Sequence, residues 1–240
     1  MNMWFALYRK ELKAQKNLIL FMLLGVVGLD LYALFGVSKG FGLFLTSMPV
    51  WVTVLLPPFM LAHSFSAEWQ AQTHYQLLAL PVRKSITVLC KYLSVMSVGI
   101  LMAVIAIGGL YLAFSGWVGS EDSSSNLTVS IMGGTPELAE LMKGGIVQYG
   151  AVALLSGLFL LLGIVSAVEG AKFAVSKWRG LVTIGGFFVC LFLYARFLTL
   201  VVNSLREFVD LGIALSLYSV LAGAIFLLIG LFLFEEYVEV

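Results

Sequence analysis

Catalytic chemistry would need a nucleophile and a base on facing segments, and this sequence offers one such pair. Ser156, followed by Gly157, could serve as the nucleophile of an intramembrane serine hydrolase, with His63 as its base. His63 lies near the end of its apolar run rather than in the middle, which disfavours that arrangement. We therefore predict no catalytic residue in this chain.

The sequence contains no motif for binding a metal ion or a nucleotide. His63 and His74 are the only histidines, and neither has an acid or cysteine at metal-ligand spacing. Cys90 and Cys190 lie in or beside apolar runs, which indicates two inert thiols. The phosphate-binding pattern GxxxxGK[ST] is absent, so the chain cannot hydrolyse ATP alone. No metal ion and no cofactor of its own is expected.

Two carboxylates stand out because they fall in or beside apolar runs. Asp30 lies about two-thirds of the way along the first run, and a carboxylate inside a membrane defaults to a functional role because it is costly there. The alternative is an early membrane boundary that leaves Asp30 near interfacial water or Lys39. Glu169 is expected to pair with Lys172 as a surface feature of little energetic weight.

Composition places these residues in a membrane. Of the 240 residues, 61% are hydrophobic and 11% are charged, whereas soluble domains are about 25% charged. The net charge of +1 indicates no nucleic-acid partner. We expect a single all-α polytopic domain over residues 1–240, with six spans. They are placed at residues 18–37, 49–67, 86–114, 146–168, 181–195 and 212–234.

Lysine and arginine positions set the expected orientation. Ten of them lie before the first run or in the second and fourth connections, and four lie in the other connections. The positive-inside rule then makes the ten cytoplasmic and puts both termini in the cytoplasm.

Several segments depart from plain spans. Pro57 and Pro58 predict a kink or break in the second span. Arg196 interrupts the fifth, so residues 196–211 could form a re-entrant outer segment. The long outer segment 115–145 contains PELAELMK, which predicts a short helix starting at Pro136. Gly108–Gly109 and Gly185–Gly186 form no GxxxG pair, so they are a weak helix-packing signal.

Residues 2–16 project as an amphipathic helix that lies at the membrane surface. An aromatic-rich half with Trp4 and Tyr8 opposes a basic half, while Glu11 and Gln15 breach the apolar side. The basic half contains Arg9, Lys10, Lys13 and Lys16. An ordinary basic flank that only sets orientation is the alternative.

The segment Glu68–Lys91 carries the longest charge-bearing stretch in the front half. A short helix with apolar Leu77, Leu78 and Leu80 could seat in a partner and transmit a push, with Pro81 setting its angle to the third span. An interfacial helix resting on lipid is the alternative.

This segment resembles the one after the second span of ABC type-2 transporter permeases, in which G-T-x-x-x-L-L-x-L-P-V follows an acidic residue and precedes a Gly-Lys. The matching residues are Glu68, Thr73, Leu77, Leu78, Leu80, Pro81, Val82, Lys84 and Lys91. Gln72 and Cys90 replace two glycines of that pattern. The basic amphipathic start and the six spans agree with the same family in outline.

The resemblance implies a complex of two permease copies, identical or paired with a sibling, and two ATPase subunits that bind ATP and Mg²⁺. Residues 68–85 would be the cytoplasmic coupling segment, including Gln72, Arg83 and Lys84. The first, second and fifth spans would line the path. The location implied is a bacterial or archaeal cytoplasmic membrane.

An apolar and aromatic lining suits a lipid, drug or amphipathic peptide. The candidate pathway or gate residues are Asp30, Phe59, Phe187, Phe188 and Arg196. The function expected is therefore the permease subunit of an ATP-driven exporter. A membrane assembly or sensor protein that never transports is the alternative.

Overall fold

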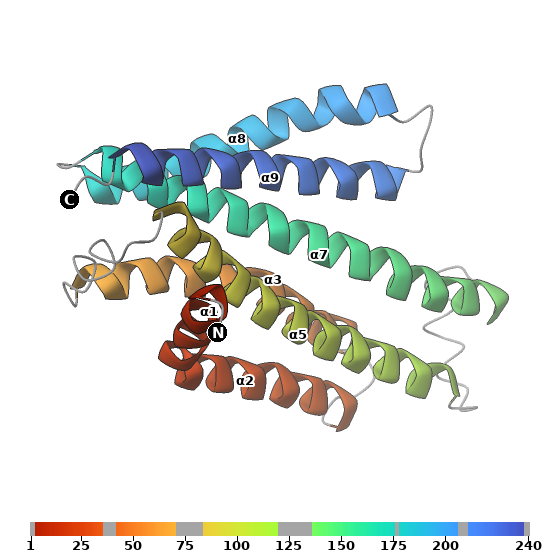
Figure 1. The fold of residues 1–240 in the computed structure, drawn as a ribbon. Helices are drawn as coiled ribbons and strands as arrows, with labels where there is room; N and C mark the ends of the chain where they lie inside the picture. Colours follow the sequence, from red (N-terminus) through yellow and green to blue (C-terminus); the bar gives the residue numbers. More distant parts are fainter. Residues whose placement is uncertain are drawn as a thin grey trace.

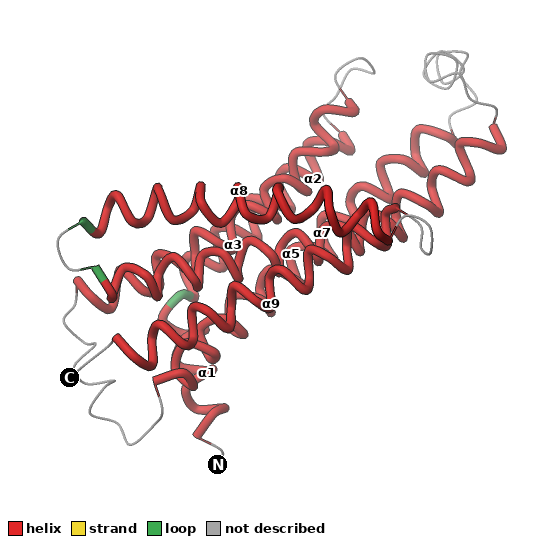
Figure 2. The backbone as a smooth tube through the Cα atoms, turned by 90° about the horizontal axis from the view of Figure 1, so that it is seen from above, coloured by secondary structure: helices red, strands yellow, loops and turns green. Residues whose placement is uncertain are grey.

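The computed structural model describes residues 3–35, 42–70, 84–119, 136–175, 178–205 and 211–237. All elements within these ranges are helices, and no strand occurs in them (Figures 1 and 2). They are α1 (Met3–Ala14), α2 (Lys16–Phe35), α3 (Gly42–Gln70), α5 (Lys84–Gly119), α7 (Pro136–Ala174), α8 (Arg179–Leu205) and α9 (Leu211–Tyr237). The expected all-α class is confirmed for the part of the chain described.

Five helices are long and apolar enough to cross a bilayer, and they correspond to the second to sixth expected spans. Their candidate spans are Ser47–Ala67, Ser85–Leu112, Gly150–Lys172, Gly180–Val201 and Gly212–Tyr237. The first expected span corresponds to α2, which forms with α1 a pair bent by 64°. A sixth span results if that pair is counted, so the count of six remains a prediction.

The bend between α1 and α2 falls at Gln15, whose amide and carbonyl groups both form backbone hydrogen bonds. The Gln15 amide donates to the Glu11 carbonyl at 3.2 Å, and the Ile19 amide donates to the Gln15 carbonyl at 2.9 Å. The short helix α1 therefore runs directly into α2 and crosses the direction of the long helices (Figure 1).

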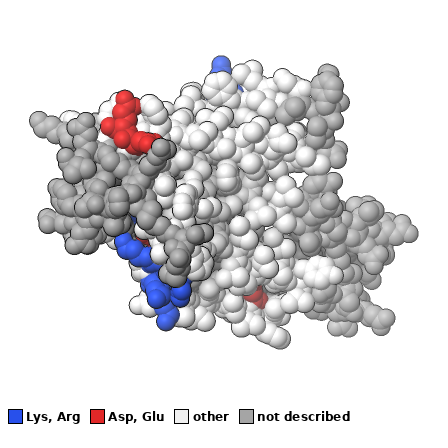
Figure 3. Space-filling model, in the orientation of Figure 1, with Lys and Arg blue, Asp and Glu red and all other residues white. Residues whose placement is uncertain are grey.

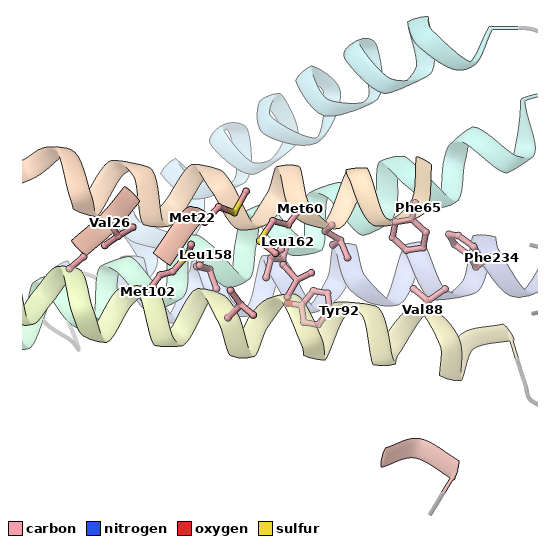
Figure 4. Close-up of a cluster of buried hydrophobic side chains, with 14 residues drawn as sticks. Met22, Val26, Met60, Phe65, Val88, Tyr92, Met102, Leu158, Leu162 and Phe234 are labelled. Atoms are coloured by element: carbon pink, nitrogen blue, oxygen red, sulfur yellow. The ribbon is translucent and has the colours of Figure 1, made fainter. Parts of the chain in front are cut away.

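The main core lies between α2, α3, α5 and α7 and closes at one end on α9 (Figure 4). It includes Val26, Met60, Met102 and Leu162, and the ring centroid of Phe234 on α9 lies 5.2 Å from that of Phe65 on α3, with the two rings tilted. A second cluster joins α7, α8 and α9. The helix α7 contributes to both clusters and has the most enclosed of the five candidate spans.

Glycines let α7 and α9 approach closely along their length. A Cβ at Gly163 would come closer than 3.0 Å to the Gly223 carbonyl, and one at Gly170 would lie 2.9 Å from the Gly230 carbonyl. The two glycines on each helix are seven residues apart, so a search for GxxxG misses them. Small residues at this spacing allow backbone contact, which drives helix association in lipid.

The prolines of α3 do not break it. The helix runs continuously from Gly42 to Gln70 with Pro49, Pro57 and Pro58 inside, so the expected break is absent. Pro57 and Pro58 are buried, and Pro57 lies close to Gly99 of α5. Surrounding protein explains why two lost donors are tolerated in one helix.

One other expected boundary differs from the structure, and one expected short helix is longer. Arg196 does not interrupt the fifth span, because α8 continues through it to Leu205, and residues 196–205 belong to that helix rather than to a separate re-entrant segment. An exposed arginine can extend its side chain toward water without ending a helix. Pro136 does begin a helix as predicted, but that helix is the start of the 39-residue α7.

Lys and Arg side chains gather at the end of the bundle near α1, and most of the described surface on this face is uncharged (Figure 3). At that same end α3 ends and α5 begins, and α7 ends and α8 begins (Figure 1). This clustering agrees with the sequence pattern that predicts the cytoplasmic side.

Candidate functional site: a buried ion pair at the base of α3 and α5

The expected coupling segment begins and ends on two helices that meet at the charged end of the bundle. The helix α3 ends at Gln70 and α5 begins at Lys84. Gln72, Thr73, Leu77, Leu78, Leu80, Pro81, Val82 and Arg83 lie outside the described residues. Glu68 is in the last turn of α3 and Lys84 is the first residue of α5. The described site therefore lies where α3 ends and α5 begins.

A buried ion pair joins three helices at this base. The Lys91 ammonium on α5 lies 3.1 Å from Glu11 Oε2 on α1, and the two side chains are 2% and 6% exposed. Lys91 Nζ also donates to Ser64 Oγ on α3 at 3.0 Å. We call Glu11, Ser64 and Lys91 the basal lock.

The basal lock satisfies charges that would be costly alone. Removing an ion from water costs several kcal/mol, and pairing offsets this only with good hydrogen-bond geometry. The Phe65 ring adds to that geometry, because Lys91 Nζ lies 5.6 Å from its centroid. The lock therefore specifies how α1, α3 and α5 are held relative to one another.

Two weaker polar contacts and one aromatic contact extend the lock. Tyr8 Oη and Ser97 Oγ are 2.8 Å apart, which links α1 to α5 a second time. Cys90 Sγ lies 4.0 Å from the Trp4 carbonyl oxygen. The Phe65 and Phe234 ring contact adds the C-terminal half of α9. Four helices thus meet near the end of α3 and the start of α5.

Lys91 was counted with the cytoplasmic charges of the sequence, and in the structure its side chain is buried within the bundle. It is the largest fully buried side chain described. The acceptors that retain it come from α1 and α3, which no local pattern reveals. One signal was available: Lys91 lies inside the expected span 86–114.

The surface of α1 is partly as predicted. Arg9, Lys10 and Lys13 are exposed, and Trp4 is 43% exposed. The Arg9 guanidinium lies 5.8 Å from the centroid of the Phe5 ring. Tyr8 is half-buried through its contact with Ser97.

The buried face of α1 differs from the predicted one. It contains Leu7, Glu11 and Gln15, which recur every four residues and point to the same side of the helix. Glu11 and Gln15 therefore do not breach an apolar lipid-facing side; they form the face that packs into the bundle.

Asp30 is buried at 8% exposure on α2 and lies directly against Gly109 of α5. A Cβ at Gly109 would come closer than 3.0 Å to the Asp30 carboxyl group. Packing of α2 on α5 therefore encloses the Asp30 carboxyl group, and its functional role stays a prediction.

The other candidate pathway residues do not meet Asp30 in one place. Phe59 on α3 and Phe188 on α8 are exposed on apolar helix faces at 68% and 65%. Phe187 packs in the second cluster with α7 and α9, and its ring lies 6.3 Å from that of Phe188. Arg196 is exposed farther along α8.

Glu169 and Lys172 form the predicted pair, but it is no surface feature. The Glu169 side chain is 5% exposed and Lys172 is 20% exposed, near the C-terminal end of α7. Close packing of α7 against α9 at Gly170 removes Glu169 from solvent. Its partner is therefore needed to compensate a buried charge.

The hydrolase pair is not assembled in the part of the chain described. His63 is exposed on α3, whereas Ser156 is buried on α7 and donates its hydroxyl to the Ala153 carbonyl. Within these residues, no group of three or more His, Cys, Asp or Glu side chains could hold a metal ion. Cys90 and Cys190 are free thiols.

Apolar helices of spanning length, with charge gathered at one end, define a multi-pass helical membrane protein. A family model described as "ABC-2 family transporter protein" matches residues 6–136, more than half of the chain, and the chain belongs to this family of transporter permeases. The matched region contains the whole basal lock and both ends of the expected coupling segment. Searches of curated proteins and of solved structures gave no match.

Proposed function

We propose that this permease exports a lipid, drug or amphipathic peptide, using ATP hydrolysed by a separate subunit that docks on residues 68–85. Two permease copies, identical or paired with a sibling, would work with two ATPase subunits that hold ATP and Mg²⁺. Family membership supports a membrane permease with an ABC ATPase partner. The docking segment, the direction of transport, the cargo and the copy number belong to the proposal.

The observation that carries the docking proposal is the basal lock. Glu11, Ser64 and Lys91 connect α1 to the two helices that enter and leave residues 71–83. Because packed interiors deform little, a push on that segment would move α1 and the ends of α3 and α5 together. A subunit driven from its cytoplasmic end needs such a connection.

The cargo class is proposed from the apolar helix faces. Phe21 and Phe35 on α2 are 75% and 85% exposed, and Phe59 and Phe188 are similarly open. Such faces suit a cargo that moves between lipid and protein more than a bare ion. Transport of a small hydrophilic ion, undiminished when Phe187 is replaced by a polar residue, would contradict this part of the proposal.

Co-purification with the candidate ATPase tests the docking proposal. We expect the ATPase to purify with the wild-type chain and to be lost with Leu77→Asp/Leu80→Asp, because two carboxylates would be buried in its groove. Ser204→Asp is the matched control, since it adds a carboxylate on the exposed surface of α8 near the opposite end. It should retain the ATPase.

If a folded wild-type chain binds no ATPase, the non-transporting alternative replaces the proposal. If the double variant binds as well as wild type, the docking segment lies elsewhere.

A further inference from the structure

Asp30 is a buried carboxyl group within an otherwise apolar helix. It lies five residues before the end of α2, whose sequence from Leu18 to Phe35 has no other charged residue. It is 8% exposed, and its Oδ2 atom has no hydrogen-bond partner among the described residues. A carboxylate at the centre of a membrane helix costs about 2.5–3.5 kcal/mol on insertion scales. Packing alone gives no reason to keep one there.

The facing helix leaves a niche for this group. Gly109 of α5 has the Asp30 carboxyl group where its own Cβ would be, and the neighbouring Gly108 has open space at the equivalent position. Only glycine at position 109 lets the carboxyl enter the seam between α2 and α5. The core around this niche is apolar, since Val26 and Ala106, one turn away on each helix, are fully buried.

One edge of the same seam is exposed and apolar. Val27 and Leu31 flank Asp30 on α2 and are 36% and 50% exposed. Leu112 lies one turn beyond Gly109 on α5 and is 56% exposed. The seam therefore combines one acidic group with an apolar rim that is open to lipid.

From this juxtaposition we infer that Asp30 binds the cationic amine of an amphiphilic cargo, whose apolar chain lies along the rim formed by Val27, Leu31 and Leu112. An ammonium group would supply the opposite charge that no described residue gives Asp30, and pairing offsets the desolvation of both ions. The inference rests on the proposed transport function and specifies its cargo class. In the described conformation α5 covers the carboxyl, so the amine enters when α2 and α5 separate at Gly109.

The test uses the permease–ATPase complex in lipid nanodiscs. Equilibrium binding of radiolabelled dodecylammonium and of dodecanol, equal in chain length but different in charge, is measured against empty nanodiscs. The wild-type complex should prefer dodecylammonium by about thirtyfold, the effect of one buried charge partner. Asp30→Asn keeps the size and one acceptor oxygen but removes the negative charge, so it should abolish this preference and leave dodecanol binding unchanged. Glu169→Gln, which neutralises another buried carboxyl group, should retain it.

Equal binding of both probes to wild type, or an unchanged preference in Asp30→Asn, would overturn the inference. A purely structural role predicts that Asn preserves binding of both probes. If the Asn variant fails to assemble, the wild-type preference and its retention in Asp30→Glu decide the question. ATPase co-purification is scored on every sample. Absence of the ATPase would contradict the proposed function. An assembled complex that does not prefer dodecylammonium would contradict only this inference.

Discussion

At the scale of single residues, the basal lock shows how a membrane subunit can retain a buried lysine. Lys91 has the Glu11 carboxylate at 3.1 Å and the Ser64 hydroxyl at 3.0 Å. Each of these groups alone would be an uncompensated polar atom in an apolar surrounding. Their value is in specifying one arrangement of three helices, because buried ion pairs contribute little net stability but cost much when broken.

Lys91→Met should therefore destabilise the protein strongly. It leaves the Glu11 carboxylate buried without its cation, at a cost of about 3–5 kcal/mol. The midpoint of thermal unfolding of the purified protein measures this loss. Lys10→Met, on the exposed face of α1, is the control and should leave the midpoint unchanged.

Adding Glu11→Gln to Lys91→Met removes the orphaned charge and should restore much of the lost stability. An unchanged midpoint in the single variant would show that the pair is not formed in the membrane.

At the scale of elements, apolar runs predict where helices lie but not how they end. The five candidate spans follow from composition, since about 20 apolar residues cross a bilayer. Composition did not predict that α3 continues through Pro57 and Pro58 or that α8 continues through Arg196. Each depends on surroundings outside the local sequence. The buried face of α1 was misassigned for the same reason: its partner α5 decides which side is covered.

The α7–α9 contact gives a matched pair of glycine substitutions. Gly163→Ala should destabilise by about 1–3 kcal/mol, because its Cβ would collide with the Gly223 backbone rather than with a flexible side chain. Gly157→Ala, on the same helix with nothing within 4 Å of the added Cβ, should be neutral or stabilising by up to about 1 kcal/mol.

Denaturant unfolding of the two variants under identical conditions measures the difference. Equal stability of the two variants would contradict close packing of α7 on α9.

At the scale of the whole molecule, the sequence predicts the class of protein better than the site. Charge distribution and apolar runs indicate a multi-pass permease, and the family match agrees. The basal lock could not be predicted, because Glu11, Ser64 and Lys91 are far apart in the chain and meet only after three helices pack. Asp30 was identifiable from its apolar neighbours, but its niche at Gly109 was not.

We expect the ATPase to dock at the end of the bundle where the basal lock lies. Cross-linking from single cysteines tests it most directly, in a chain with Cys90 and Cys190 replaced by alanine and reconstituted with its ATPase. Gln76→Cys is in the expected coupling segment, and Ser204→Cys is at an exposed position in the last turn of α8. The C-terminal end of α8 lies away from the charged end of the bundle (Figure 1). We predict a cross-link to the ATPase from position 76 and none from position 204. A cross-link from position 204, or none from position 76 in an assembled complex, would contradict the account.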